Sequence, residues 1–271
     1  MAGGLRVRGR PLRAPGRRID GGAALELIVR PELVRRDLGP SSLDEAHILY
    51  EDDALIAVDK PPGLATVPSA DLRRPSLVGL VEGLLRSRAR GGRSAPRSLG
   101  VHQRLDQDTS GVVLFVKDPA ANAGLAAQFA AHTVEKTYLA LTERPARLPP
   151  KAWRRDDMVG DRPAVTDFVV AEVLARGLLV EAHPRTGRKH QVRVHLADAG
   201  MPLLGDRRYG GESGEAPRVM LHAARLSLRH PLTDAPLSVE SPFPVDFRVV
   251  LEARRAPRAS ATVARPRRRA R

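Results

Sequence analysis

The sequence contains no cysteine, and this absence removes several kinds of chemistry at once. Disulfides, cysteine-ligated zinc and thiol nucleophiles are all excluded. No apolar run approaches the roughly 18 residues that a membrane-spanning helix needs. The N-terminal residues 1–18 also lack the apolar stretch of a secretory signal. We therefore expect a cytoplasmic protein with no membrane partner.

The central part of the chain has no excess charge, although the formal net charge is +14. Residues 1–18 hold six arginines, residues 253–271 hold eight, and neither segment contains an acid. Removing those 14 arginines from the 45 basic residues leaves 31, which equals the 31 acidic residues. Attraction to a polyanion such as RNA is therefore concentrated in two terminal arms. A genome that favours arginine codons would produce the same bias, and both explanations stay open at this point.

The chain has enough length and apolar content, 271 residues and 42% hydrophobic, for one large domain with a small appendage. Residues 7–33 have the pattern of two short strands around Pro- and Gly-rich turns, and residues 39–47 resemble a linker. We predict three parts. These are a basic arm (1–44), a packed domain (45–250) and a basic, disordered tail (251–271).

Short strands mixed with single helices are predicted for the packed domain. Strands are predicted at 54–58, 112–116 and 133–143, a hairpin across 175–177, and helices at 76–88, 119–132 and about 189–200. Because no regular alternation of strand, helix and strand is present, the pattern indicates an α+β fold.

Asp106 is the first candidate for chemistry, in the stretch QRLDQDTSGVVLFVKD at 103–118. Taken alone, it is more simply a turn residue whose carboxylate accepts backbone hydrogen bonds. The segment 186–195 contributes Arg193, which could stand beside a carboxylate and keep it ionised in a cleft. A zinc site at His190 and His195 is disfavoured, because a separation of five residues is poor ligand spacing.

Tyr138 and Lys60 each allow a structural and a functional interpretation. Tyr138 is one of only three tyrosines and lies in the middle of a predicted strand, where it could belong to the core or stack on a base. Lys60 opens a Lys-Pro-Pro-Gly turn and could contact phosphate or simply form the turn.

Five stretches, in this order, resemble the RluA-type pseudouridine synthases, which isomerise uridines in RNA. They are VDKPPGLATVP (58–68), RLDQDTSGVVLFVKD (104–118), EKTYLAL (135–141), TGRKHQVRVHLADAGMPLLGDRRYG (186–210) and LHAARLSLRHPLT (221–233). The resemblance covers about residues 47–250. It implies a pseudouridine synthase fold, with a mixed, mostly antiparallel sheet, flanking helices and a central RNA-binding cleft.

The resemblance also implies roles for individual residues. Asp106 would be the catalytic carboxylate, Arg193 its partner and Tyr138 the ring that packs on the flipped base. Arg104 would enter the RNA where the uridine leaves the stack, offsetting part of an extrusion cost of about a few kcal/mol. Four further residues are expected to contact RNA: Lys60, Arg188, His190 and Gln191. The expected partner is ribosomal or transfer RNA, the expected protein a monomer, and no metal or organic cofactor is implied.

Two departures from the family pattern stand out. The family commonly reads His-Arg-Leu-Asp, whereas Gln103 intervenes here, so no role is transferred to His102. Residues 5–29 resemble the later half of an S4 RNA-binding module; either the module is degenerate or the likeness is one of turns. Two other functions stay open, a non-catalytic RNA-binding or ribosome-assembly protein and, with less support, a metal-dependent hydrolase that uses histidines.

Overall fold

The computed structural model describes residues 42–69, 71, 74–89, 96–211 and 216–256, and the backbone of three strands nearer the N-terminus. Contacts within the chain divide it into two units, Met1–Gly39 and Pro40–Arg271. The smaller unit contains an antiparallel sheet of order β2-β1-β3, one strand more than predicted. Its strands are β1 (Gly4–Val7), β2 (Arg10–Pro11) and β3 (Leu25–Ile28). The S4-like module remains a prediction.

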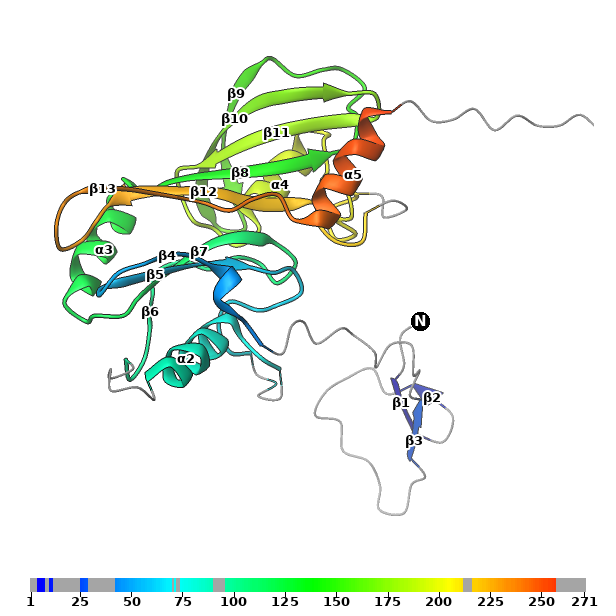
Figure 1. Ribbon diagram of the computed structural model, residues 1–271. Coiled ribbons are helices and arrows are strands. Elements are labelled where there is room, and N and C mark those ends of the chain that lie inside the picture. Colours follow the sequence, from blue (N-terminus) through cyan, green and yellow to red (C-terminus); the bar gives the residue numbers. More distant parts are fainter. Residues whose placement is uncertain are drawn as a thin grey trace, which may run out of the picture. The chain divides into compact units, whose positions relative to one another are not determined.

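The larger unit is built on a ten-stranded sheet of order β4-β5-β7-β12-β8-β11-β10-β9, with β6 paired to β7 and β13 to β12 (Figure 1). Its strands are β4 (Ile48–Glu51), β5 (Leu55–Lys60), β6 (Gly100–Val101), β7 (Ser110–Val116), β8 (Glu135–Thr142), β9 (Ala152–Val159), β10 (Arg162–Leu174), β11 (Gly177–Pro184), β12 (Leu221–Arg229) and β13 (Pro236–Glu240). Its helices are η1 (Glu45–His47, a 3₁₀ turn), α2 (Leu77–Arg88), α3 (Ala121–Ala130), α4 (Gln191–Asp198) and α5 (Val245–Arg255).

The pairing in this sheet is mixed and mostly antiparallel, as predicted. Among the described strands only β7 and β12 run parallel, with Ser110 opposite His222 and Gly111 opposite Ala223. Gly111 has a φ of +116°, and a Cβ there would lie 2.2 Å from the Ala223 carbonyl oxygen. The pairing of β7 with β12 joins two halves of the sheet, one with β4, β5, β6 and β7 and the other with β12, β13, β8, β11, β10 and β9. A side chain at position 111 would therefore disrupt this joint.

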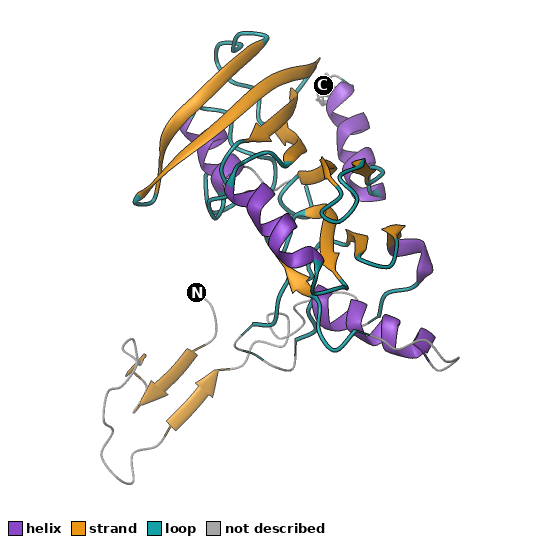
Figure 2. Ribbon diagram, turned by 90° about the vertical axis from the view of Figure 1, so that its left-hand side faces the viewer, coloured by secondary structure: helices purple, strands orange, loops and turns teal. Residues whose placement is uncertain are grey.

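Helices cover both faces of each half of the sheet, and Figure 2 shows them flanking the strands. Alternate residues of a strand point to opposite faces, so neighbours in β5 and β7 belong to different clusters. Ile56 and Val113 pack with α2, whereas Leu55 and Leu114 pack with α3.

The same division holds in the second half of the sheet. There Ala140 of β8 packs on the side of α4, and Leu141 packs on the side of α5.

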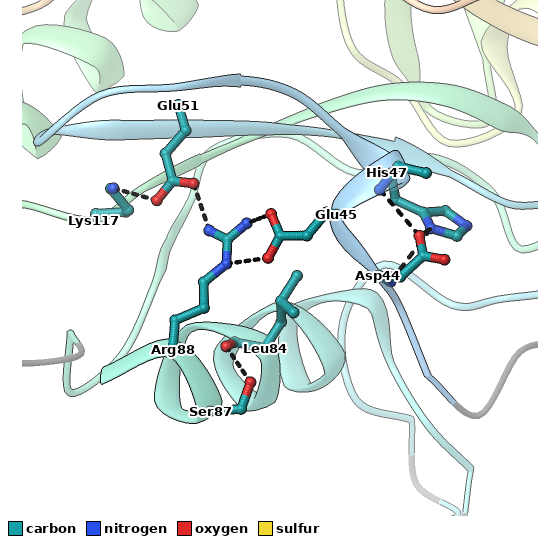
Figure 3. Close-up of polar contacts among 9 residues, drawn as sticks. Asp44, Glu45, His47, Glu51, Leu84, Ser87, Arg88 and Lys117 are labelled. Carbon is teal, nitrogen blue, oxygen red and sulfur yellow. Dashed lines mark hydrogen bonds and ion pairs between the residues drawn. The ribbon is translucent and has the colours of Figure 1, made fainter. Parts of the chain in front are cut away.

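A network of ion pairs fastens the first described residues of this unit to α2 and to the end of β7 (Figure 3). Arg88 at the end of α2 pairs with Glu45 of η1, and its Nη1 donates to Glu51 Oε2 at 2.6 Å. Lys117, just after β7, donates to the other oxygen of Glu51 at 2.7 Å. These contacts join η1, β4, α2 and β7, so the predicted linker at 39–47 ends in structured chain.

Two sequence expectations need correction in this unit. The strand β9 was not predicted, because its Trp-Arg-Arg-Asp-Asp core lacks the apolar alternation of a half-buried strand. The tail does not begin at residue 251, because α5 continues to Arg255 and buries Leu251 and Arg254. Residues 257–271 and residues 90–95 of the predicted basic loop lie outside the described part. No helix of the described residues has the length and apolarity to cross a bilayer.

Candidate active site

The loop before β7 carries Asp106 and is fixed to other segments on both sides of that residue. The Thr66 hydroxyl donates to the Leu105 carbonyl at 3.0 Å and accepts from the Leu105 amide at 3.1 Å. Lys60 Nζ donates to the Gln107 carbonyl at 2.8 Å. The position of Asp106 is therefore set by its neighbours in the chain, which leaves its own side chain free to face the cleft.

Lys60 was predicted to contact RNA, but its position in the structure does not allow this. Its side chain is completely buried, and Nζ donates to the carbonyls of Pro61, Leu64 and Gln107. Burial lowers the pKa of Lys60 to about 7, although the nearby carboxylates of Asp108 and Asp106 oppose this shift. Because all its donors are directed at backbone carbonyls, Lys60 supports the loop of Asp106 from inside the protein.

Asp106 meets Arg193 across the joint of the sheet, as predicted. Arg193 Nη1 donates to Asp106 Oδ2 at 3.0 Å, although the two residues are far apart in sequence. His190 Nε2 lies 3.6 Å from the same oxygen. The side chain of Asp106 is 23% exposed, so the carboxylate is partly covered but reachable from the cleft.

A second carboxylate holds Arg193 from behind. Asp206, in the turn after α4, accepts from Nε at 2.7 Å and from Nη2 at 2.9 Å of Arg193. Burial opposes the charged form of Arg193, but the hydrogen bonds to Asp206 and Asp106 outweigh it and raise the pKa of Arg193. A bidentate pair fixes the plane of the guanidinium. The one nitrogen left over is the one directed at Asp106.

Tyr138 lines the same cleft from the middle of β8. Its partners in the sheet are the small residues Ala182 on β11 and Ala223 on β12, which leave room for the ring. Burial raises the pKa of Tyr138, and the negative charge of Asp106 raises it further. The phenol therefore stays neutral at physiological pH and presents an uncharged aromatic face.

The cleft has a volume of about 740 Å³. Its rim includes Arg104, which is exposed and has no hydrogen bond or ion pair with any described residue. Arg188 also lines the cleft and is partly exposed, and its Nε donates to the Pro163 carbonyl at 3.0 Å. Both side chains can therefore face an RNA phosphate without losing an internal ion pair.

His190 stands at the start of α4 in a left-handed backbone conformation, with φ of +60°. Its Nδ1 lies 3.0 Å from the Tyr209 hydroxyl, and the Tyr209 ring also lies under the Arg193 guanidinium, 5.2 Å from its carbon. Burial lowers the pKa of His190, while Asp106 acts in the opposite direction. Its predicted RNA contact is geometrically open because it lines the cleft.

Gln191 lies on the cleft wall but does not present free groups to RNA. Its side chain is buried, and its Oε1 accepts from the Thr186 hydroxyl and the Arg188 amide. Its Nε2 donates to the Val165 carbonyl and the Thr166 hydroxyl, both at 2.9 Å. The predicted RNA contact of Gln191 is therefore corrected: the residue ties the turn before α4 to β10.

Asp206 and Tyr209 were missed by sequence reasoning. Both lie in the segment LLGDRRYG, which carried the family resemblance but gave no signal of its own for either residue. An Asp 13 residues after an Arg is not a helical or strand spacing, so no local rule pairs it with Arg193.

The two histidines considered for zinc contact different groups. His190 faces Asp106 and Tyr209, whereas buried His195 contacts the Thr166 hydroxyl through Nδ1 at 2.9 Å. Within the described residues, no three His, Asp or Glu side chains gather closely enough to hold a metal ion. The hydrolase alternative therefore has no ligand set in this part of the chain.

Comparison with known proteins gives the same assignment as the motifs. The RNA pseudouridylate synthase family matches residues 54–198, more than half of the chain. The chain therefore belongs to this family, and the resemblance to its RluA-type members is confirmed. It is an RNA pseudouridine synthase, an isomerase with an RNA substrate.

Individual relatives cover most of the chain. It is 38% identical over 218 residues to an uncharacterized RNA pseudouridine synthase of Bacillus subtilis (strain 168), covering 75% of this chain and 70% of the relative. It is 34% identical over 264 residues to the ribosomal large subunit pseudouridine synthase D of Nitrosomonas europaea, covering 87% of this chain and 75% of the relative. The solved structure of human RNA pseudouridylate synthase domain containing 4 aligns with a TM-score of 0.64 at 25% identity, covering 78% of this chain and 95% of that one.

Proposed function

We propose that this enzyme isomerises uridines of large-subunit ribosomal RNA, with Asp106 as its catalytic carboxylate. One contact carries the assignment of Asp106: Arg193 Nη1 lies 3.0 Å from its Oδ2 in a cleft that Tyr138 also lines. The ribosomal substrate is supported by relatives named ribosomal large subunit pseudouridine synthase C and D. Transfer RNA is the alternative substrate class.

The reaction breaks the N1–C1′ bond of a uridine and joins C1′ to C5 of the same base. N1 gains a proton and C5 loses one, so the conversion needs no net reactant. Asp106 can act as a nucleophile toward the sugar or the base, or as a base toward the C2′ proton. Each of these roles needs an unprotonated carboxylate in contact with the nucleoside, which the partly covered position of Asp106 allows.

The remaining residues divide the physical work of flipping and holding the base. Arg104 fills the space that the uridine leaves, offsetting part of an extrusion cost of about a few kcal/mol. Tyr138 packs on the base and keeps it in the cleft while it turns from its N1 to its C5 face. Arg193 orients Asp106 and is itself oriented by Asp206.

The test is complementation of a strain that lacks the gene. The strain carries wild type, Asp106→Asn or Asp118→Asn, and its total RNA is treated with a carbodiimide. Pseudouridines are then mapped as the positions where the carbodiimide adduct stops reverse transcription. Asp118 is a matched control, because its exposed carboxylate accepts from the Ala120 amide in the turn before α3, and an asparagine oxygen can accept the same hydrogen bond. We expect stops in large-subunit ribosomal RNA to return with wild type and Asp118→Asn and to stay absent with Asp106→Asn.

Three results would overturn parts of the proposal. Full modification by Asp106→Asn removes the assigned carboxylate. Stops that return only in transfer RNA remove the ribosomal substrate. Wild-type protein that binds RNA but releases no tritium from 5-tritiated uridine RNA supports the non-catalytic alternative instead.

A further inference from the structure

Arg218 is a buried arginine that the reaction described above does not use. It lies just before β12, its side chain is 7% exposed, and it forms a bidentate pair with Asp246 at the start of α5. The two hydrogen bonds, from Nε to Oδ2 and from Nη2 to Oδ1, measure 2.6 and 3.0 Å. Burial works against the charged form of Asp246, but these hydrogen bonds outweigh it and lower the pKa of Asp246.

The far end of the same guanidinium reaches the loop of Asp106. Its Nη1 donates to the Asp108 carbonyl at 3.0 Å and also lies within hydrogen-bond distance of the Val219 and Leu221 carbonyls. Its Nη2 donates to the Ser110 hydroxyl at 3.1 Å. One side chain therefore ties together the catalytic loop, the first residue of β7 and the first residue of β12.

The hydrogen bonds continue beyond Ser110 in one direction. His222 Nε2 lies 3.2 Å from the Ser241 carbonyl, which can only accept, so this nitrogen carries the proton. His222 Nδ1, 3.0 Å from the Ser110 oxygen, must then accept from the hydroxyl. The Ser110 oxygen in turn accepts from Arg218. Each donor in this series, from Arg218 through Ser110 and His222, therefore has an acceptor.

Two buried side chains hold consecutive backbone carbonyls directly after Asp106. Lys60 holds the Gln107 carbonyl, and Arg218 holds the next carbonyl, that of Asp108. Arg193 approaches the Asp106 carboxylate from the other half of the sheet. Arg218 and Arg193 therefore contact the same loop, one at a backbone carbonyl and the other at the Asp106 carboxylate.

We propose that Arg218, oriented by Asp246, is a positioning residue that sets the distance of Asp106 from Arg193 and from the bound uridine. This inference rests on the role proposed above for Asp106. Displacement of a reacting group by about 1 Å can cost about 100-fold in rate. The competing explanation is that the pair only fastens α5 to the sheet.

The variant Arg218→Lys separates these explanations. A lysine can keep an ion pair with Asp246, but its single nitrogen cannot reproduce the fork that also reaches Asp108 and Ser110. We expect the single-turnover rate at saturating RNA to fall about tenfold or more, with the dissociation constant for RNA changed by less than about twofold. The rate is corrected for the folded fraction, measured by circular dichroism at the same temperature.

Two further variants complete the experiment. Arg255→Gln removes a bidentate pair with Glu172 at the other end of α5, where it touches no catalytic segment, and should leave the rate unchanged. Asp246→Asn leaves Arg218 in place with a weaker partner and should give a smaller loss of rate than Arg218→Lys. It also provides a second reading if Arg218→Lys folds poorly.

The outcomes distinguish this inference from the proposed role of Asp106. A wild-type rate in Arg218→Lys and Asp246→Asn, with Asp106→Asn inactive, overturns the positioning role alone. Equal losses in Arg255→Gln and Asp246→Asn show that only the anchoring of α5 matters and overturn it too. Activity in Asp106→Asn removes the role of Asp106 on which the inference rests.

Discussion

Asp206 grips Arg193 through two parallel hydrogen bonds, of 2.7 and 2.9 Å, on the side away from the cleft. Asp206 is 1% exposed and does not line the cleft. Its influence on the reaction therefore passes through Arg193, whose remaining nitrogen faces Asp106. Arg193 therefore bridges two carboxylates, the buried one of Asp206 and the one of Asp106 that we propose to be catalytic.

Asp206→Asn should lower both stability and rate. The buried guanidinium keeps Asp106 as a partner but loses half of its charge compensation, so we expect a loss of about 2–3 kcal/mol in the free energy of unfolding. The loosened guanidinium should lower the single-turnover rate about tenfold or more. Urea unfolding and single-turnover assays measure the two effects.

The exposed pair Arg229–Asp234 provides a control with similar fork geometry. Asp234→Asn should change neither quantity measurably, because solvent screens that pair. An Asp206→Asn enzyme that is as stable and as fast as wild type would show that Arg193 needs no second carboxylate.

Arg104→Ala should slow the reaction without destabilising the protein. Arg104 is exposed and has no partner among the described residues, so its removal breaks no internal contact. We expect the rate to fall about tenfold on a target uridine in a stacked helix, and less on one in an open loop, because an unpaired base costs less to extrude. Fluorescence of 2-aminopurine placed beside the target reports the flipping step.

Arg97→Ala is the matched control, since Arg97 is also exposed but does not line the cleft. It should leave both flipping and rate unchanged. If the two alanine variants behave alike on both substrates, the insertion role of Arg104 is wrong.

Lys60→Met should change how stability depends on pH. In the folded protein the pKa of Lys60 is lowered to about 7, below the ordinary value of 10.5. Between these values the unfolded chain binds more protons than the folded one, so raising the pH through this window stabilises the wild type, by at most about 1.4 kcal/mol per pH unit. The methionine variant lacks this pH-dependent part of the free energy of unfolding.

Urea unfolding between pH 6 and 9 should show the wild type gaining stability relative to Lys60→Met above pH 7. Parallel stability curves would contradict the prediction.

Removal of residues 257–271 should weaken RNA binding through charge alone. The segment contains six arginines, and cutting after Ala256 keeps all of α5. Each phosphate that these arginines neutralise adds about 0.7–0.9 to the slope of log affinity against log salt concentration. We expect a shallower slope and lower affinity, with unchanged turnover at saturating RNA.

A full-length variant with the same six arginines replaced by serine separates charge from length, and should match the truncated protein in a salt titration. Loss of turnover at saturating RNA in either variant would place this segment in the active body instead.

Several elements were predictable because a few neighbouring residues encode them. The apolar run at 112–116 gives β7, and the apolar spacing in 76–88 gives α2, whose Ser76 caps the helix through the Gly79 amide. The resemblance of five stretches to a known family predicted that Asp106, Arg193 and Tyr138 share one site, and all three line the same cleft. In contrast, β9 could not be found, since its charged residues become a strand only by pairing with β10.

The sequence alone determined the chemical groups of the site, the short-range elements that carry them and the charge of the two arms. Tertiary structure decided which cationic side chains line the cleft and which are buried in the interior. Lys60, Gln191 and Arg218 are polar residues whose burial follows from where the strands of the sheet meet. That meeting depends on the register of β7 against β12, segments more than 100 residues apart, and no local pattern of residues contains it.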